Sequence, residues 1–224
     1  MRNDTEDAPR AIAPRRSKGR PRTFDRERAL HSALEVFWKR GYEPATVGEL
    51  CAAMGINPPS LYAAFGNKAA LFMEAVEHYE TTYWAVPWRE LDAEPDLRTA
   101  MERFLLDAAA VLTSLDAPCG CMVVLATANV SAEAQDVHEA LKALRGRSRA
   151  NFLRRLDRAQ ESGDLPPGTD VAALASAFNT LLQGMSVQAR DGAPREDLER
   201  IARASLAMLP RARSHAADGA SRAP

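Results

Sequence analysis

Two cysteines separated by one residue, in the segment PCGCM, are the side chains with the most evident chemistry in this sequence. Cys119 follows Pro118 near a predicted helix start, where the helix dipole favours the reactive thiolate form of a thiol. Cys119 and Cys121 are therefore candidates for a thiol sensor. A metal site would need further ligands, of which only His138 is close in the sequence. Plain packing is the third interpretation, because free cysteines are among the most buried residues.

Other signatures of catalysis are missing from the sequence. It contains no Gly-rich phosphate loop, no Walker pattern and no G-x-S-x-G elbow. The histidines are scattered and suggest no catalytic cluster; they are His31, His78, His138 and His215. We therefore predict that the protein is not an enzyme, needs no cofactor and holds no metal. A thiol redox enzyme built on the two cysteines is the alternative from another class.

Composition predicts a cytoplasmic protein with an ample core. The 224 residues are 46% hydrophobic, and the formal net charge of −1 argues against a uniformly basic nucleic-acid coat. An odd count of three cysteines favours a reducing compartment. No apolar run reaches the ~18 residues that a membrane span needs, and the charged N-terminus lacks the apolar segment of a signal peptide. We expect no membrane association.

Basic residues gather near the N-terminus. Six of them lie between Arg10 and Arg22 with no acidic residue among them. We predict that residues 1–22 form a disordered basic arm whose Arg20 and Arg22 enter a minor groove of DNA, with a merely solubilising tail as the alternative. Residues 211–224 have a similar low hydrophobicity and are predicted to be a disordered tail.

Helical spacing dominates the rest of the chain. A first helix is expected to begin near Asp25 and to stop at Gly41. Thr46 and Glu49 have capping-box spacing and predict the start of a second helix, which Gly55 ends. Longer amphipathic helices follow, at roughly 96–115, 119–131, 133–162, 170–190 and 195–209. The run CMVVLATANV is ambiguous, since its β-branched residues also suit a buried strand.

A very short helix is predicted in the segment GINPPSLYAAFGNKAAL. Asn57 is a good N-cap, and Pro58 occupies the first helical position, where its missing N–H costs nothing. Gly66 closes the element, and Asn67 caps a longer helix that runs through Tyr79. Together with the preceding helix and tight turn, this order predicts a helix-turn-helix.

Residues 24–72 closely resemble the N-terminal domain of TetR/AcrR-type transcriptional regulators. The matching text is ALHSALEVFWKRGYEPATVGELCAAMGINPPSLYAAFGNKAALF. The resemblance implies an all-α protein of about nine helices, with a three-helix helix-turn-helix domain at 23–68 and a helical ligand-binding and dimerisation domain at 69–210. It also implies a homodimeric repressor that binds a palindromic double-stranded DNA operator and is released by a small-molecule effector.

The short third helix is then the recognition helix. Its groove-facing candidates are Asn57, Pro58, Pro59, Ser60 and Ala63. The resemblance assigns the phosphate backbone to Thr46, Tyr62 and Lys68. Many relatives carry a bulky polar residue after the tyrosine, whereas this chain has Ala63-Ala64, so direct hydrogen-bond readout is expected to be sparse. A non-specific architectural DNA binder is a further alternative.

Aromatic residues crowd the segment YETTYWAVPW, where the DNA domain is expected to join the ligand domain. They predict an apolar pocket for a neutral or weakly polar effector, with ordinary core as the alternative. The candidate ligand-binding residues are Tyr83, Trp84, Trp88, Phe104, Met122, Leu125, Asn129 and Phe152. A regulator that senses thiol chemistry through Cys119 and Cys121 is the competing mechanism.

The last two helices carry apolar residues interspersed with small ones. Two such helices from each chain would form a four-helix dimer interface. The candidate interface residues are Leu174, Phe178, Leu181, Met185, Leu198 and Ile201. Completion of the monomer core is the alternative for these positions.

Overall fold

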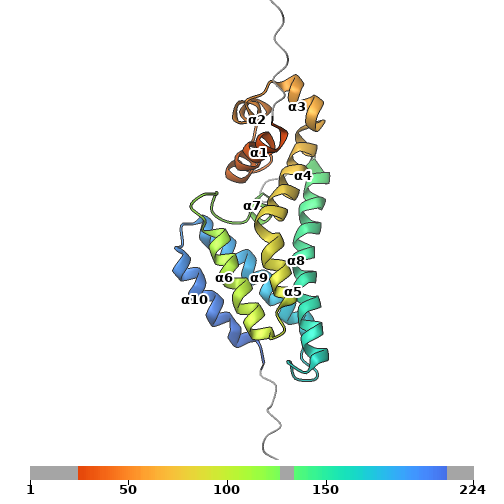
Figure 1. Cartoon of the computed structure of the whole chain (residues 1–224), viewed down its shortest axis with the longest axis vertical. Helices are drawn as coiled ribbons and strands as arrows, with labels where there is room; N and C mark the ends of the chain where they lie inside the picture. The colour runs from red at the N-terminus through yellow and green to blue at the C-terminus, as the bar shows by residue number, and fades with distance from the viewer. Residues whose placement is uncertain (1–24, 127–133, 211–224) are drawn as a thin grey trace, which may run out of the picture.

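A computed structural model of the chain describes residues 25–126 and 134–210, and this part is entirely helical (Figure 1). The N-terminal helices are α1 (Arg26–Arg40), α2 (Val47–Met54) and α3 (Pro58–Phe65). A long rod follows, made of α4 (Lys68–Tyr79), a π-helix (Glu80–Trp84) and α5 (Ala85–Ala93). The remaining α-helices are α6 (Leu97–Leu112), α7 (Met122–Leu125), α8 (Gln135–Ser162), α9 (Val171–Arg190) and α10 (Arg195–Ser205), and a 3-10 turn (Leu206–Met208) ends the described chain.

Side-chain caps fix the ends of the N-terminal helices. The Asp25 carboxylate accepts from the backbone N–H groups of Glu27 and Arg28 and starts α1. Thr46 and Glu49 form a complete capping box at the start of α2. Each cap satisfies N–H groups that have no partner inside the helix. The boundaries predicted for the first three helices are therefore confirmed.

The fourth helix is longer than the sequence indicated. It was expected to run through Tyr79, with Trp84 and Trp88 around its end, yet the rod continues to Ala93. Pro87 lies inside α5, where it has no N–H to donate and its ring crowds the preceding turn. The π-helix just before it widens that turn and leaves room for the proline. The sequence places the end of the fourth helix in this segment and did not reveal that the helix passes through Pro87.

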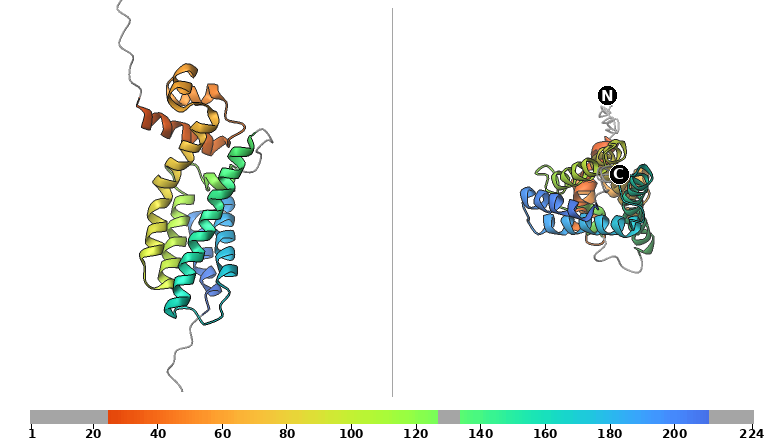
Figure 2. Two further views of the ribbon diagram at one scale, coloured as in Figure 1. Left: turned by 90° about the vertical axis from the view of Figure 1, so that its right-hand side faces the viewer. Right: turned by 90° about the horizontal axis from the view of Figure 1, so that it is seen from below.

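The C-terminal helices form a bundle below the three small helices, with the α4–α5 rod running through both parts (Figures 1 and 2). Phe104, Phe152 and Phe178 come from α6, α8 and α9 and pack ring against ring in its core. Arg155 of α8 is buried as well, and it donates to the backbone carbonyls of Leu91, Glu94 and Pro95. This guanidinium ties α8 to the turn between α5 and α6.

The other long predicted helices are confirmed with small shifts at their ends. Of the predicted helix at 119–131, the described residues show Met122–Leu125 as helix, and residues 127–131 lie outside the described part of the chain. The described part of this run is helical and contains no strand. Since α4, the π-helix and α5 form one continuous rod, the described chain holds nine separate helices besides the final turn, as expected. No helix in the described ranges is both long and apolar enough to span a bilayer.

Candidate nucleic-acid interface and effector cavity

The short helix α3 presents one face to the protein and one to solvent. Leu61 and Phe65 are buried, and the Arg26 guanidinium lies 4.5 Å from the centre of the Phe65 ring. The Asn57 side chain accepts from the Ser60 N–H at 2.9 Å and fixes the first turn. The groove-facing candidates lie on the opposite side: Asn57, Pro58, Pro59 and Ala63 are exposed, and Ser60 is half-buried. The arrangement matches a recognition helix whose N-terminal residues meet base edges.

Tyr62 and Thr46, which the family resemblance assigns to the phosphate backbone, are both exposed. The Tyr62 side chain is 49% exposed and projects from the outer face of α3. Thr46 is exposed at the N-terminus of α2, where N–H groups and the helix dipole favour a phosphate. Arg20 and Arg22, predicted to enter a minor groove, lie outside the described residues.

Lys68 is less free than the sequence indicated. Its Nζ donates to the Glu43 carbonyl oxygen at 3.1 Å and lies 4.5 Å from the centre of the Tyr42 ring. Partial burial lowers the pKa of the ammonium group, while the Glu43 carboxylate opposes that shift. An ammonium group has three donors. Lys68 can therefore hold the α1–α2 loop and still offer N–H donors to a phosphate.

The two cysteines have different environments. Cys119 is exposed in the loop after α6, and Cys121 is buried immediately before α7. Burial raises the pKa of the Cys121 thiol to about 11, although a hydrogen bond with Tyr79 opposes the shift. A thiol with so high a pKa is protonated near neutral pH and reacts slowly. For Cys121 this geometry favours packing over thiol sensing, and the described residues contain no group of three or more potential metal ligands.

The predicted ligand-binding residues divide between cavity walls and core. A groove of about 740 Å³ lies between the α4–α5 rod and α8, and a small enclosed cavity of about 30 Å³ lies deeper, between the rod, α7, α8 and α9. Trp88 lines both spaces and Trp84 lines the inner cavity. Phe104, Met122 and Phe152 are almost completely buried and line neither, so they belong to the packed core.

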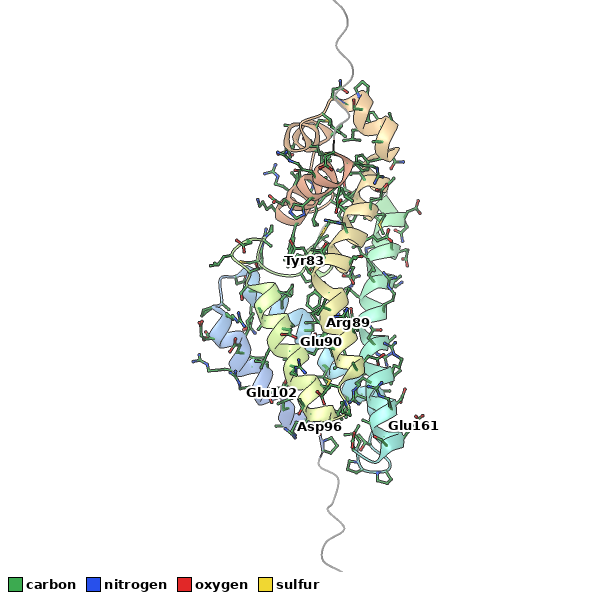
Figure 3. The ribbon with its side chains drawn as sticks, viewed as in Figure 1. Tyr83, Arg89, Glu90, Asp96, Glu102 and Glu161 are labelled. Atoms are coloured by element: carbon green, nitrogen blue, oxygen red, sulfur yellow. The ribbon has the colours of Figure 1, made fainter. Side chains whose placement is uncertain are left out.

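Three other candidates lie elsewhere. Tyr83 meets Trp38 edge to face and Tyr79 in a tilted ring contact, at the junction between the upper helices and the bundle (Figure 3). Leu125 is half-buried beside Gly120, outside both cavity walls. Asn129 lies outside the described residues. The aromatic cluster therefore serves two places, the domain junction and the cavity, where the sequence predicted one pocket.

Sequence reasoning missed the polar residues of the inner cavity. Glu80 comes from the π-helix, Arg145 and Ser148 from α8, and Asn179 and Gln183 from α9. Arg145 and Ser148 are three residues apart on α8, and Asn179 and Gln183 are four residues apart on α9, so each pair lies on one face of its helix. This spacing is the sequence signal that could have predicted a polar patch inside the bundle. Burial raises the pKa of Glu80, an effect that Arg147 opposes, and desolvation lowers the pKa of Arg145.

Direct bonds join the DNA-facing helices to the bundle. The Trp38 Nε1–H of α1 donates to the Gly120 carbonyl oxygen at 2.8 Å in a buried contact. The next residue, Cys121, donates its N–H to the Ser186 Oγ of α9 at 2.7 Å. At the surface, Arg190 donates to the Lys39 carbonyl oxygen at 3.0 Å. The loop at Gly120 therefore connects α1 to α9.

The predicted dimer-interface residues also divide into two groups. Phe178, Met185 and Leu198 are almost completely covered within a single chain, so a partner could bury little more of them, and they belong to the monomer core. Leu174, Leu181 and Ile201 are half-buried and remain available. The exposed stripe of α9 instead carries Ala173, Thr180, Gly184 and Val187.

Comparison with known proteins identifies the family. Residues 29–75 match the family of bacterial regulatory proteins of the tetR type, and residues 97–205 match the tetracyclin repressor-like C-terminal domain. The HTH-type transcriptional repressor ComR of Escherichia coli K12 is 34% identical over 197 residues, which cover 88% of this chain and 94% of that protein. The chain belongs to the TetR family.

Two further relatives agree with this assignment. The TetR family regulator CifR, solved as a cysteine mutant complexed with 26-bp double-strand operator DNA, superposes with a TM-score of 0.82. The alignment is 44% identical and covers 86% of this chain and all of that one. The transcriptional repressor BdcR of E. coli K12 is 38% identical over 125 residues, covering 54% of this chain and 62% of that protein. This TetR-family chain is thus a helix-turn-helix DNA-binding regulator.

Proposed function

We propose that this TetR-family regulator is a homodimeric repressor that binds a palindromic operator through α3 and releases it when a small molecule enters the C-terminal bundle. The observation that carries the proposal is the geometry of α3. Two buried side chains, Leu61 and Phe65, anchor a helix of two turns whose outer face is exposed along its length. ComR and BdcR are named as transcriptional repressors, and CifR was solved in complex with operator DNA, which supports the same role for this chain. The proposed location is the cytoplasm, where bacterial DNA lies.

The DNA-binding part of the proposal is tested with a matched pair of variants. Ala63 is exposed on α3, and Ala150 is exposed on α8 in the bundle. A carboxylate at position 63 would enter the groove between two rows of phosphates. Ala63→Glu should therefore weaken binding to the upstream region of the protein's own gene by more than about tenfold, measured by fluorescence anisotropy. Ala150→Glu adds the same charge away from α3 and should bind normally. Equal binding by both variants would contradict the assignment of α3.

The dimer part is tested on α9. Gly184 is exposed, and a side chain added there meets no atom of its own chain within 4 Å. Gly184→Arg should therefore leave the protomer folded and prevent the close approach of a second α9. Gly146→Arg on α8 is the control, because that glycine has equally open surroundings. Sedimentation should show twice 24.4 kDa for the wild type and the control, and a single chain for Gly184→Arg. A Gly184→Arg dimer would place the interface elsewhere.

A further inference from the structure

The inner cavity contains a buried polar atom that lacks a partner. Asn179 Oδ1, on α9, is inaccessible to solvent and makes no hydrogen bond to any group in the described residues. An atom left unpaired in this way has lost its hydrogen bonds to water without gaining one in the protein, so native chains seldom keep one without a use. Asn179 lines the cavity of about 30 Å³ together with Trp84, Ser148 and Gln183.

The size of this cavity limits what it can accept. A volume of about 30 Å³ has room for one or two water molecules, which leaves space for a single hydroxyl or N–H group and not for a ring. The body of a ligand must lie elsewhere. The outer groove of about 740 Å³ falls within the range typical of small-molecule sites, and its wall includes apolar residues such as Met73, Val76 and Leu144.

The groove and the inner cavity adjoin each other. Trp88 and Glu80 line both, and Trp88 is half-buried. Rotation of its indole would connect the two spaces. A molecule lying in the groove could then pass one polar group beside Trp88 and reach Asn179.

The charges around the inner cavity favour an uncharged group. The Glu80 carboxylate and the Arg145 guanidinium both line it, so each attracts one sign of ligand charge and repels the other, and the pair gives no net preference for either sign. The Arg145 side chain already donates to the Val123 carbonyl oxygen at 3.4 Å. A charged ligand would also lose its hydration on entry, at a cost that a neutral donor avoids.

We propose that the effector of this regulator is an uncharged, mainly apolar molecule that carries a hydroxyl group, and that this hydroxyl donates a hydrogen bond to Asn179 in the inner cavity. The proposal rests on the proposed function for its regulatory meaning and adds the chemical class of the ligand and the residue that selects it. A hydroxyl can donate and accept, so it pairs with the Asn179 amide in either orientation of that amide.

The test compares two probes of similar shape, para-ethylphenol and para-ethyltoluene, in which a methyl group replaces the hydroxyl. Isothermal titration of the full-length protein should show tighter binding of the phenol by about fivefold, the effect of one net hydrogen bond. Asn179→Leu replaces the amide with an apolar side chain of similar size and should abolish that preference. Asn151→Leu on α8, outside both cavities, is the matched control and should keep it.

Three results would overturn the proposal: no binding of the phenol at millimolar concentration, equal binding of both probes, or a preference that persists in Asn179→Leu. If that variant does not fold, Asn179→Ala gives the same comparison, because it only removes atoms. The phenol should also release labelled operator from the wild-type protein, while the toluene does so more weakly. Failure to bind operator without any probe would count against the proposed function alone, since the calorimetry does not depend on DNA.

Discussion

Gly120 gives the sharpest prediction for the stability of the fold. It has a φ of +83°, a left-handed conformation that costs residues other than glycine about 1–2 kcal/mol. A Cβ added there would lie 2.6 Å from Leu125 Cδ1 and 2.8 Å from the Ser186 carbonyl oxygen. The leucine side chain can rotate, but the backbone of α9 cannot move without disturbing the bundle. Overpacking of this kind costs a further ~1–3 kcal/mol.

Gly163 separates the two contributions. Its φ is +87°, yet an added Cβ would meet no atom within 4 Å. Gly163→Ala should therefore lose about 1–2 kcal/mol from the backbone alone, and Gly120→Ala about 2–5 kcal/mol from the backbone and the clash. In a chain of this size each kcal/mol lowers Tm by about 2–4 °C.

Thermal unfolding followed by far-UV circular dichroism, at one protein concentration, checks this difference. Gly120→Ala should unfold at a Tm lower than that of Gly163→Ala by about 2–12 °C. Equal Tm values would refute the reasoning, because they would mean that the α9 backbone yields to the methyl group at little cost.

Three further predictions concern single side chains. Lys68→Ala should weaken binding to all DNA sequences about equally and reduce by about one unit the magnitude of the slope of log K against log salt concentration. Fluorescence anisotropy at several salt concentrations measures this slope. A changed sequence preference with an unchanged slope would contradict the phosphate role of Lys68. Exposed Cys119 should react with iodoacetamide near neutral pH far faster than buried Cys121, whose pKa of about 11 leaves almost no thiolate. Peptide mass spectrometry measures the two rates, and faster labelling of Cys121 would contradict the prediction. Arg155→Leu should cost about 3 kcal/mol or more in urea unfolding, because three carbonyl oxygens lose their donor, whereas exposed Arg154→Leu should cost much less.

The helix-turn-helix was predictable because its determinants are local. The caps at Asp25, Thr46 and Asn57 contact N–H groups two or three residues away, so their spacing in the sequence is also their spacing in space. The glycines at 41 and 55 end their helices through positive φ angles, a requirement that the residue type itself signals. Such features need no knowledge of the tertiary fold.

The cavity was not predictable for the opposite reason. Helical periodicity says which face of α9 is apolar, but not which residue of α8 or of the rod that face meets. Asn179 gains its role only because Trp84, from a segment about a hundred residues earlier, closes the space around it. The aromatic cluster was likewise visible in the sequence. The sequence did not show that Tyr83 lies at the domain junction while Trp88 lies at the cavity, because that depends on the π-helical geometry of the residues between Tyr79 and Ala85.

The π-helix is where the cavity and the DNA-facing helices meet. It supplies Glu80 and Trp84 to the inner cavity, and the residue just before it, Tyr79, packs edge to face against Trp38 of α1. Phe37 and Phe72 form a second ring contact between α1 and α4, so the helices around α3 are expected to move with α4 as one body. A ligand that displaces Trp88 acts on α5, four residues after the π-helix, and a π-helical turn is a place where a long helix can bend. In the proposed dimer, a small rotation there would change the separation of the two copies of α3 from the ~34 Å of one DNA turn, and we expect release of the operator to follow from that mismatch.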